Sequence, residues 1–147
     1  MKILGIESSC DETSASVVEM TDTDRSIRSN IVASQIDIHR LYGGVVPEIA
    51  GRAHIEAISR ITYEAIETAG ISVSDISAVA VTTHPGLIGA LLVGVNFGKS
   101  LAFANNIPLV GVDHVRGHIA AAYLEYPNLE PPFLGVVLSG GHTSFYV

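Results

Sequence analysis

The stretch KILGIESSCDETSASVVEM, residues 2–20, decides the fold. Its first part, residues 2–8, has the apolar pattern of a buried strand, the small and acidic residues SCDET form a turn, and residues 14–20 continue as a second strand. The same order of apolar strand, small polar turn and strand returns in LGVVLSGGHTSFYV, residues 134–147. This repetition predicts two lobes, each of which begins with a hairpin.

Between the two hairpins the pattern alternates between strands and helices. Residues 27–36 predict a third strand, and residues 37–47 a loop around the Gly43-Gly44 pair. The later predicted elements are a helix from Pro47 to the terminating Gly70, a strand at 76–83, a helix at 89–105, a strand at 108–112 and a helix at 114–124. Three antiparallel strands followed by this alternation indicate an α/β fold with a mixed sheet flanked by helices. We expect the first lobe to span residues 1–130, and residues 131–147 to begin a second, truncated lobe.

Composition restricts the class of protein. The chain has 147 residues, 48% of them hydrophobic, and its single cysteine, Cys10, fits a reducing compartment, so we expect a cytoplasmic protein. The long apolar stretch 86–104 is interrupted by Asn96 and Lys99, so no membrane span is predicted. A net charge of −7 makes the chain a poor binder of nucleic acid by itself, because phosphate contacts need a surplus of Lys and Arg.

The sequence VDHVRGH places His114 and His118 four residues apart, directly after a predicted strand. This spacing puts both imidazoles on one face of a helix, where they could bind one metal ion or serve as ordinary polar residues. A zinc protease would need a glutamate directly after the first histidine. Here Val115 follows it, so the pattern does not indicate a peptidase.

Other motifs leave two interpretations open. Gly140 and Gly141 could form an anion-binding nest or an ordinary hairpin turn, and the acidic turn at 7–13 could simply be solvated. Glu48 and Arg52 could form an intrahelical ion pair or border a reaction cleft. Cys10 is predicted to be a packed small residue rather than a nucleophile. The glycines of the predicted helix at 89–105 and the turn before it suggest close approach by another helix, from this chain or a partner.

Five motifs together resemble the TsaD/Gcp family, the tRNA N6-adenosine threonylcarbamoyltransferases formerly labelled O-sialoglycoprotein endopeptidases. These motifs are GIESSCDET, YGGVVPEIAGRAH, PGLIGALLVG, DHVRGH and LSGGHT, in the family's order along the whole chain. The resemblance implies the two-lobed, actin-like ATPase (ASKHA, ribonuclease H-like) fold. Because family members are longer, we expect this chain to correspond to their N-terminal half.

The resemblance also assigns roles to individual residues. His114 and His118 match the family's metal-ligand histidines, for one Fe²⁺ or Zn²⁺ per subunit, while the family's third ligand, an aspartate, is expected outside this chain. Asp11 and Glu12 fall in the first phosphate loop and are expected to be catalytic, with Mg²⁺ a further possible ion beside a nucleotide. The residues expected to contact the adenylate substrate are Val137, Leu138, Ser139, Gly140, Gly141 and His142.

The reaction implied is transfer of threonylcarbamoyl from threonylcarbamoyl-AMP to the adenosine 3′ of the anticodon in tRNAs that read ANN codons. In bacteria the implied partners are a TsaB-like paralogue and a TsaE-like ATPase, and we expect a helix-mediated dimer through residues 48–69 and 89–105. The alternatives are a non-catalytic TsaB-like scaffold, whose family lacks the histidine pair, and a phosphotransferase of the same superfold. With only two metal ligands, this chain alone is expected to be inactive.

Overall fold

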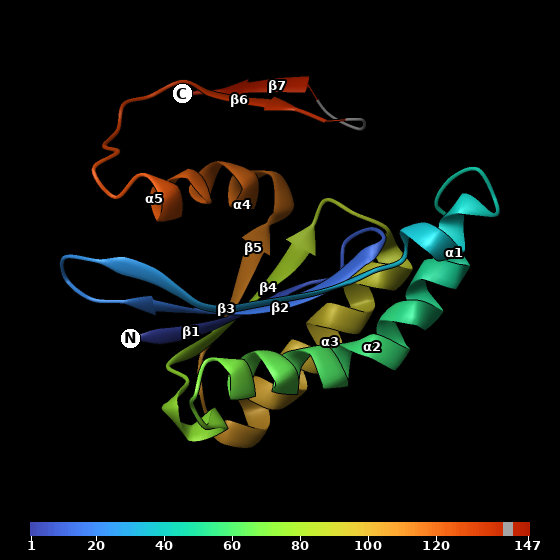
Figure 1. Cartoon of the computed structure of the whole chain (residues 1–147), viewed down its shortest axis with the longest axis horizontal. Helices are drawn as coiled ribbons and strands as arrows, with labels where there is room; N and C mark the ends of the chain where they lie inside the picture. Colours follow the sequence, from blue (N-terminus) through green and yellow to red (C-terminus); the bar gives the residue numbers. More distant parts are fainter. Residues whose placement is uncertain (140–142) are drawn as a thin grey trace.

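A five-stranded mixed sheet forms the centre of the molecule (Figure 1). The computed structural model describes residues 1–139 and 143–147. The strands lie in the order β3-β2-β1-β4-β5, with β1, β2 and β3 antiparallel and β4 and β5 added parallel to β1. Their bounds are β1 Lys2–Glu7, β2 Glu12–Met20, β3 Arg25–Ser34, β4 Ala78–His84 and β5 Leu109–Asp113. The mixed sheet expected from the sequence is therefore confirmed.

Helices cover both faces of this sheet. Two long helices, α2 (Pro47–Thr68) and α3 (Ile88–Asn105), pack on one face, and α4 (His114–Ala120) and α5 (Ala122–Glu125) lie on the other (Figure 1). Successive strand residues point to opposite faces, so alternate positions meet different helices. The buried core lies on the α2–α3 side and contains Leu4, Ile6, Val17, Ile58, Ile66, Val79, Val81 and Leu101.

The ends of α2 follow the predicted capping signals. Pro47 occupies the first turn, where its missing N–H is not needed, and Glu48 adds negative charge at the positive end of the helix dipole. Gly70 follows the helix with φ +67°, a left-handed conformation that favours glycine. Both signals are confirmed.

A separate hairpin forms the C-terminal part of the described chain. Strands β6 (Gly135–Leu138) and β7 (Thr143–Tyr146) pair antiparallel in their own sheet, and the hairpin lies against α4, away from the main sheet (Figure 1). A Cβ atom at Gly135 would lie 3.4 Å from Ile119 on α4, which is ordinary van der Waals contact, so the strand packs directly on the helix here.

Two expectations about helices are wrong. The predicted loop over 37–47 contains a short helix, α1 (Ile36–Arg40), which is held by the buried His39. The helix predicted over 114–124 is divided into α4 and α5. The division occurs because the N–H of Leu124 bonds to the carbonyl of Ala121, three residues earlier, and this tighter turn interrupts the α-helical pattern.

The glycines around α3 fit tightly against the turn after β1. A Cβ atom on Gly94 would come within 2.4 Å of Ser8 Oγ, and one on Gly86 within 2.6 Å of the Ser9 carbonyl oxygen. A Cβ on Gly89 would meet nothing within 4 Å. At Gly86 and Gly94 the close neighbour is therefore the strand-to-turn segment of the same chain, and not another helix.

Of the helices in the described residues, α3 alone is long and apolar enough to cross a membrane by length and composition. Its residues Ala90, Leu91, Gly94, Gly98, Leu101 and Ala102 are buried in the folded chain. One such helix is weak evidence for a membrane span, and in the folded chain α3 packs against β4 and α2.

Candidate functional site

The parallel strands bring several polar residues to one edge of the sheet. The register pairs Ile6 of β1 with Val81 of β4, and Thr82 of β4 with Val112 of β5. The carboxyl ends of all three strands therefore meet, which places Glu7, Thr82 and the start of α4 side by side. This is where open α/β sheets usually bind ligands.

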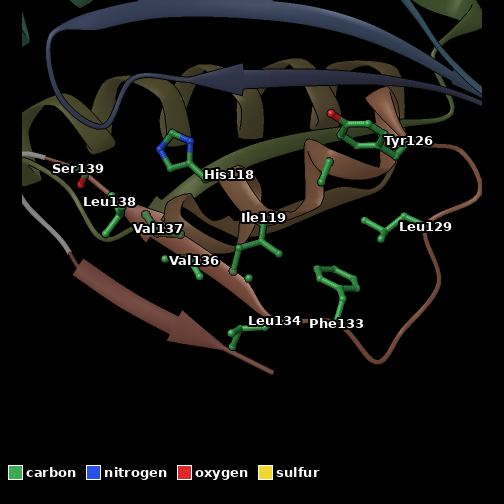
Figure 2. Close-up of a pocket in the computed structure, with 12 residues that line it drawn as sticks. His118, Ile119, Tyr126, Leu129, Phe133, Leu134, Val136, Val137, Leu138 and Ser139 are labelled. Carbon is green, nitrogen blue, oxygen red and sulfur yellow. The ribbon is translucent and has the colours of Figure 1, made fainter.

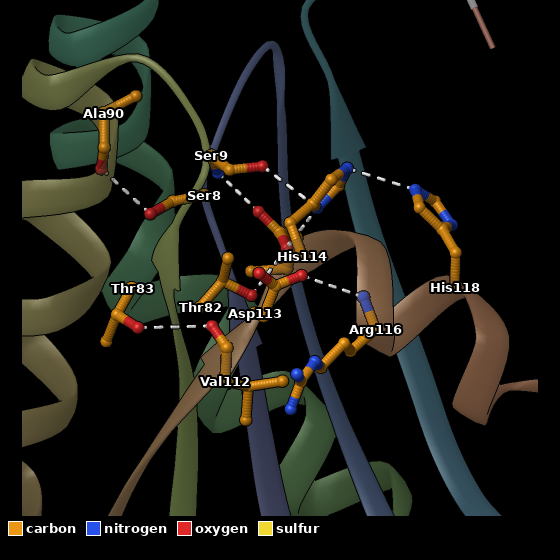
Figure 3. Close-up of polar contacts among 11 residues, drawn as sticks. Ser8, Ser9, Thr82, Thr83, Ala90, Val112, Asp113, His114, Arg116 and His118 are labelled. Carbon is orange, nitrogen blue, oxygen red and sulfur yellow. Dashed lines mark hydrogen bonds and ion pairs between the residues drawn. The ribbon is translucent and has the colours of Figure 1, made fainter. Parts of the chain in front are cut away.

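His114 is the first residue of α4 and is hydrogen-bonded to the end of β1. Its Nδ1 lies 3.0 Å from Glu7 Oε2 and 3.2 Å from Ser9 Oγ (Figure 3). The helix start is held by Asp113, whose Oδ1 accepts the backbone N–H of Arg116 at 2.9 Å. That hydrogen bond lowers the pKa of Asp113 below its ordinary value. The cap thus keeps the carboxylate charged at the helix N-terminus.

His118 lies one turn further along α4 and faces His114. The two Nε2 atoms are 3.0 Å apart, and the ring centroids are separated by 4.5 Å with the planes at 80° (Figure 3). His114 is half-buried, whereas His118 is exposed. The structure therefore brings both histidines together on one helix face, as the spacing predicts; their metal-binding role stays a prediction.

The arrangement of the pair fits a metal ion. Both Nε2 atoms point at the same small region, and imidazole nitrogen is a ligand that suits both zinc and iron. Among residues 1–139 and 143–147, no group of three or more His, Cys, Asp or Glu side chains is placed to hold a metal. The described chain therefore offers two ligands, and a complete site would need further ones.

Glu7 belongs to the acidic turn at 7–13, but the sequence analysis gave it no role of its own. Its carboxylate accepts hydrogen bonds from the Ser9 backbone N–H, from Thr82 Oγ1 at 2.6 Å, and from Nδ1 of His114 at 3.0 Å. Burial by itself raises the pKa of Glu7, but these hydrogen bonds together lower it below the ordinary value. Its position at the carboxyl end of a strand paired with parallel strands is the signal that could have identified it.

Two cavities open around His118. The first, of about 490 Å³, lies between the sheet and α4 and is lined by Glu7, Thr82 and His118 among others. The second, of about 570 Å³, lies between α4, α5 and β6 (Figure 2). Figure 2 shows His118 and Ser139 at one end of the second cavity, with Tyr126, Leu129 and Phe133 toward the other end.

The second cavity contains part of the predicted substrate-binding run. Val137, Leu138 and Ser139 line it, and Val137 is half-buried whereas Leu138 and Ser139 are exposed. Gly140, Gly141 and His142 lie outside the described residues, so the predicted anion nest has no structural test here. The substrate role of the whole run stays a prediction.

The predicted catalytic residues Asp11 and Glu12 lie further along the β1–β2 turn. Glu12 is exposed at the start of β2, and Asp11 is half-buried with its carbonyl oxygen accepting the Gln35 N–H at 3.0 Å. In this structure the carboxylate bonded to His114 is instead that of Glu7. The catalytic roles of Asp11 and Glu12 stay a prediction.

Cys10, in the same turn, is exposed, so the expectation that it is packed is wrong. Desolvation and the neighbouring Asp11 raise its pKa above the ordinary thiol value. A raised pKa leaves less thiolate at neutral pH, and the thiolate is the nucleophilic form. The environment is therefore unfavourable for nucleophilic chemistry.

The two arginines of α2 form ion pairs with glutamates of the same helix. Arg52 bonds Glu48 at 2.8 Å and Arg60 bonds Glu64 at 3.2 Å, both one turn apart on exposed surface. The first distance confirms the intrahelical pair of Glu48 and Arg52, and a position of these residues at the border of a reaction cleft stays a prediction. Such exposed pairs contribute little to stability, but they neutralise positive charge that a nucleic acid would otherwise meet.

Comparison with protein families gives one strong match. The model for TsaD, tRNA N6-adenosine threonylcarbamoyltransferase, matches residues 26–147. The chain is 57% identical over 143 residues to the tRNA N6-adenosine threonylcarbamoyltransferase of Clostridium novyi (strain NT), covering 97% of this chain and 41% of that protein. For the enzyme of the same name from Clostridium perfringens (strain SM101 / Type A), the identity is 56% over 141 residues, covering 96% of this chain and 41% of that protein. The chain thus spans 41% of the length of these relatives.

Comparison with solved structures supports the fold. YeaZ from Pseudomonas aeruginosa superimposes with a TM-score of 0.63 at 15% identity, covering 100% of this chain and 66% of YeaZ. The PPX-GPPA enzyme of Aquifex aeolicus gives a TM-score of 0.50 at 13% identity, covering 99% of this chain and 47% of that chain. Identities this low show the fold alone. The expected actin-like, ribonuclease H-like class is confirmed.

Proposed function

This chain belongs to the tRNA N6-adenosine threonylcarbamoyltransferase (TsaD) family, and from that premise we propose that it forms the metal-binding half of such an enzyme. The observation that carries the proposal is the convergence of the His114 and His118 Nε2 atoms, 3.0 Å apart, beside the cavity between α4, α5 and β6. The complete activity is proposed for the protein at the length of its relatives, because the chain spans 41% of them.

His114 and His118 would hold one Fe²⁺ or Zn²⁺. The metal, when bound, would act as a Lewis acid toward the carbamoyl carbonyl of the donor. Two residues of the chain orient the His114 ring. Asp113 caps the helix on which His114 lies, and Glu7 hydrogen-bonds Nδ1 of His114, the nitrogen that would not bind the metal. Further ligands are required from outside the described residues.

The donor would occupy the cavity that His118 shares with Val137, Leu138 and Ser139. In the proposed reaction the N6 atom of adenosine attacks the carbamoyl carbon of threonylcarbamoyl-AMP. The new N–C bond forms as the bond from that carbon to the AMP phosphate oxygen breaks, and AMP leaves while the N6 proton passes to solvent or a base. We propose that residues 137–142 hold the adenylate, with Gly140, Gly141 and His142 completing the contact, and that Mg²⁺ accompanies a nucleotide only if one binds there.

Asp11 and Glu12 remain our proposed catalytic carboxylates. The support is their turn: Ser9, two residues before Asp11, already contacts His114 at 3.2 Å. We propose that a carboxylate of this turn accepts the N6 proton.

Charge indicates that tRNA is bound with help from partners. The net charge is −7, and Arg28, Arg52 and Arg60 each pair with a glutamate of this chain. We propose that a TsaB-like paralogue and a TsaE-like ATPase supply positive charge and complete the assembly in a bacterial cytoplasm. The face that would receive the paralogue is the groove between α2 and α3, described in the Discussion.

The alternatives receive less support. A non-catalytic scaffold would have no use for two imidazoles that converge beside a cavity. A phosphotransferase of the same superfold would share the sheet, but the relatives at 55–57% identity carry the transferase name.

The test is a transfer assay with threonylcarbamoyl-AMP, an ANN-reading tRNA and the partner proteins. Replacing His114 or His118 with alanine, in a version extended to the length of the relatives, should remove metal and abolish N6 modification. The control Glu64→Gln, which changes an exposed carboxylate on α2, should retain the rate. The unextended 147-residue chain is expected to be inactive. Full activity of either histidine variant would contradict the proposal, and a 147-residue chain as fast as the extended version would contradict the need for further ligands.

A further inference from the structure

We propose that Glu7 is a positioning residue that fixes the tautomer of His114, so that the Nε2 lone pair of this histidine is available to the metal. The inference rests on the proposed metal-binding role of the histidine pair. It concerns a residue outside the pair, located on a different element, at the end of β1.

The surroundings of Glu7 leave its carboxylate little freedom. Oε1 accepts the backbone N–H of Ser9, and Oε2 accepts the hydroxyl of Thr82 at 2.6 Å. These two donors come from the turn after β1 and from the neighbouring strand β4, so they hold the carboxylate plane from two sides. Its side chain is 30% exposed, which keeps solvent from competing freely for its oxygens.

The fixed carboxylate determines where the proton of His114 lies. A carboxylate can only accept hydrogen bonds, so the Nδ1 atom 3.0 Å from Oε2 must carry the proton. Neutral imidazole carries one proton, and Nε2 is then left with its lone pair. Ser9 Oγ, at 3.2 Å, can either donate or accept, so this hydroxyl cannot select the tautomer by itself.

The exposed Nε2 of His114 lies 3.0 Å from Nε2 of His118. Without metal, a proton on His118 Nε2 can be shared with the His114 lone pair. For both nitrogens to bind a metal ion, that proton would have to move to Nδ1 of His118, which leaves both Nε2 lone pairs for the metal. The arrangement carboxylate–imidazole–metal also makes the imidazole a stronger ligand.

Glu7→Gln tests this role with almost no change in shape. The amide offers both N–H and C=O groups, so it can pair with either tautomer of His114 and no longer selects one. We expect the variant to populate the Nε2–H tautomer, which blocks the metal-binding nitrogen. Loss of such an outer contact typically weakens metal affinity by about 10–100-fold.

The experiment uses two readouts that need no substrate. The first is the ¹⁵N NMR spectrum of the histidine rings in the metal-free chain, which reports the tautomer of His114. The second is titration with Co²⁺ alone, carried out on a version extended to the length of the relatives so that the further metal ligands are present. Glu64→Gln is the matched control, because it makes the same chemical change on an exposed carboxylate. Thr82→Val is a second variant that keeps the charge of Glu7 but removes one of its donors.

We expect wild type and Glu64→Gln to show the Nδ1–H tautomer and equal Co²⁺ affinity. Glu7→Gln should show mixed tautomers and an affinity lower by about 10–100-fold, and Thr82→Val should show a smaller loss. An unchanged tautomer and unchanged affinity in Glu7→Gln would overturn the inference; should that variant not fold, wild-type behaviour of Thr82→Val would overturn it. Failure of the wild-type version, extended to the length of the relatives, to bind Co²⁺ through His114 and His118 would instead contradict the proposed function.

Discussion

At the residue scale, His54 shows how one buried side chain of α2 holds the turn that leads to the site. The imidazole is fully buried. Its Nε2 donates to the Cys10 carbonyl oxygen at 3.1 Å, and because Nε2 carries the proton, Nδ1 accepts the Thr13 hydroxyl at 2.7 Å. In the neutral form both nitrogens are therefore hydrogen-bonded. Burial lowers the pKa of His54, although the Cys10 hydrogen bond and the nearby carboxylates of Glu7 and Asp11 partly oppose this effect.

The lowered pKa of His54 predicts loss of stability in mild acid. The unfolded histidine titrates near pH 6.5, so below that pH the unfolded state binds a proton that the folded state still excludes. Its contribution to the free energy of unfolding is therefore fully present above about pH 6.5 and is lost as the pH falls through the lower folded-state pKa. His54→Gln should remove the part of the pH dependence of the free energy of unfolding that comes from His54. It should also lower the free energy of unfolding at pH 7.5 by about 1–3 kcal/mol, because the hydrogen bonds of His54 are broken.

Urea unfolding at several pH values between 5 and 8 (a range of about three units around the histidine pKa) measures this slope. Ser59→Ala, an exposed and non-titrating change on the same helix, serves as the control and should follow wild type. Equal pH slopes for His54→Gln and wild type would show that His54 does not carry the effect.

At the scale of elements, α3 is fixed to β1 by a contact that requires glycine. Ser8, directly after β1, donates its hydroxyl to the Ala90 carbonyl at 2.9 Å (Figure 3) and accepts the Gly94 N–H at 3.1 Å. The helix approaches so closely that a Cβ on Gly94 would lie 2.4 Å from Ser8 Oγ. Ser8 is buried, so neither group can turn to solvent. The adjoining Ser9 faces His114, so this contact also supports the site.

We predict that Gly94→Ala destabilises the chain by about 1–3 kcal/mol, the usual cost of overpacking. Gly89→Ala, on the same helix, is the matched control: its added methyl meets nothing within 4 Å, and alanine should stabilise the helix by up to about 1 kcal/mol. Thermal unfolding of both variants provides the measurement. If Gly94→Ala has the same stability as Gly89→Ala, the close approach of Ser8 does not restrict the residue at position 94.

At the scale of the whole molecule, the helical layer of α2 and α3 leaves a groove uncovered. The groove has a volume of about 610 Å³ and is lined by Ile55, Ser59, Leu92, Asn96 and Ser100 among others. Ile55 is 66% exposed and Leu92 50% exposed, although both are large and apolar. Within the described residues nothing covers them, which supports the expected role of these two helices in association.

We predict that Leu92→Glu weakens binding to a TsaB-like paralogue by tenfold or more, which is about 1.4 kcal/mol. Stability should change little, because Leu92 is half exposed. Phe103→Glu is the control, since Phe103 is 89% exposed on the same helix but outside the groove. Calorimetric titration with the paralogue gives the affinities, and light scattering of the chain alone tests self-association. Equal affinities for the two variants would place the interface elsewhere.

Local patterns predicted the order and type of most elements. The alternation of apolar residues marked the strands, and Pro47 and Gly70 marked the ends of α2, because these signals depend on neighbours along the chain. The same local reading missed α1, which is held by the buried His39 through contacts with Gln35 and Val46. It also misread Gly94, whose close neighbour is Ser8, 86 residues away, and not another helix.

For the site, the sequence by itself determined that His114 and His118 share one helix face, because a spacing of four residues brings side chains together in any α-helix. Only the tertiary structure decided that Glu7 holds His114, since the two are separated by 107 positions. That contact exists because β1, β4 and β5 run parallel and their carboxyl ends meet at one edge. Which strands pair depends on the packing of the whole core, so no local pattern around Glu7 could predict its contact with His114.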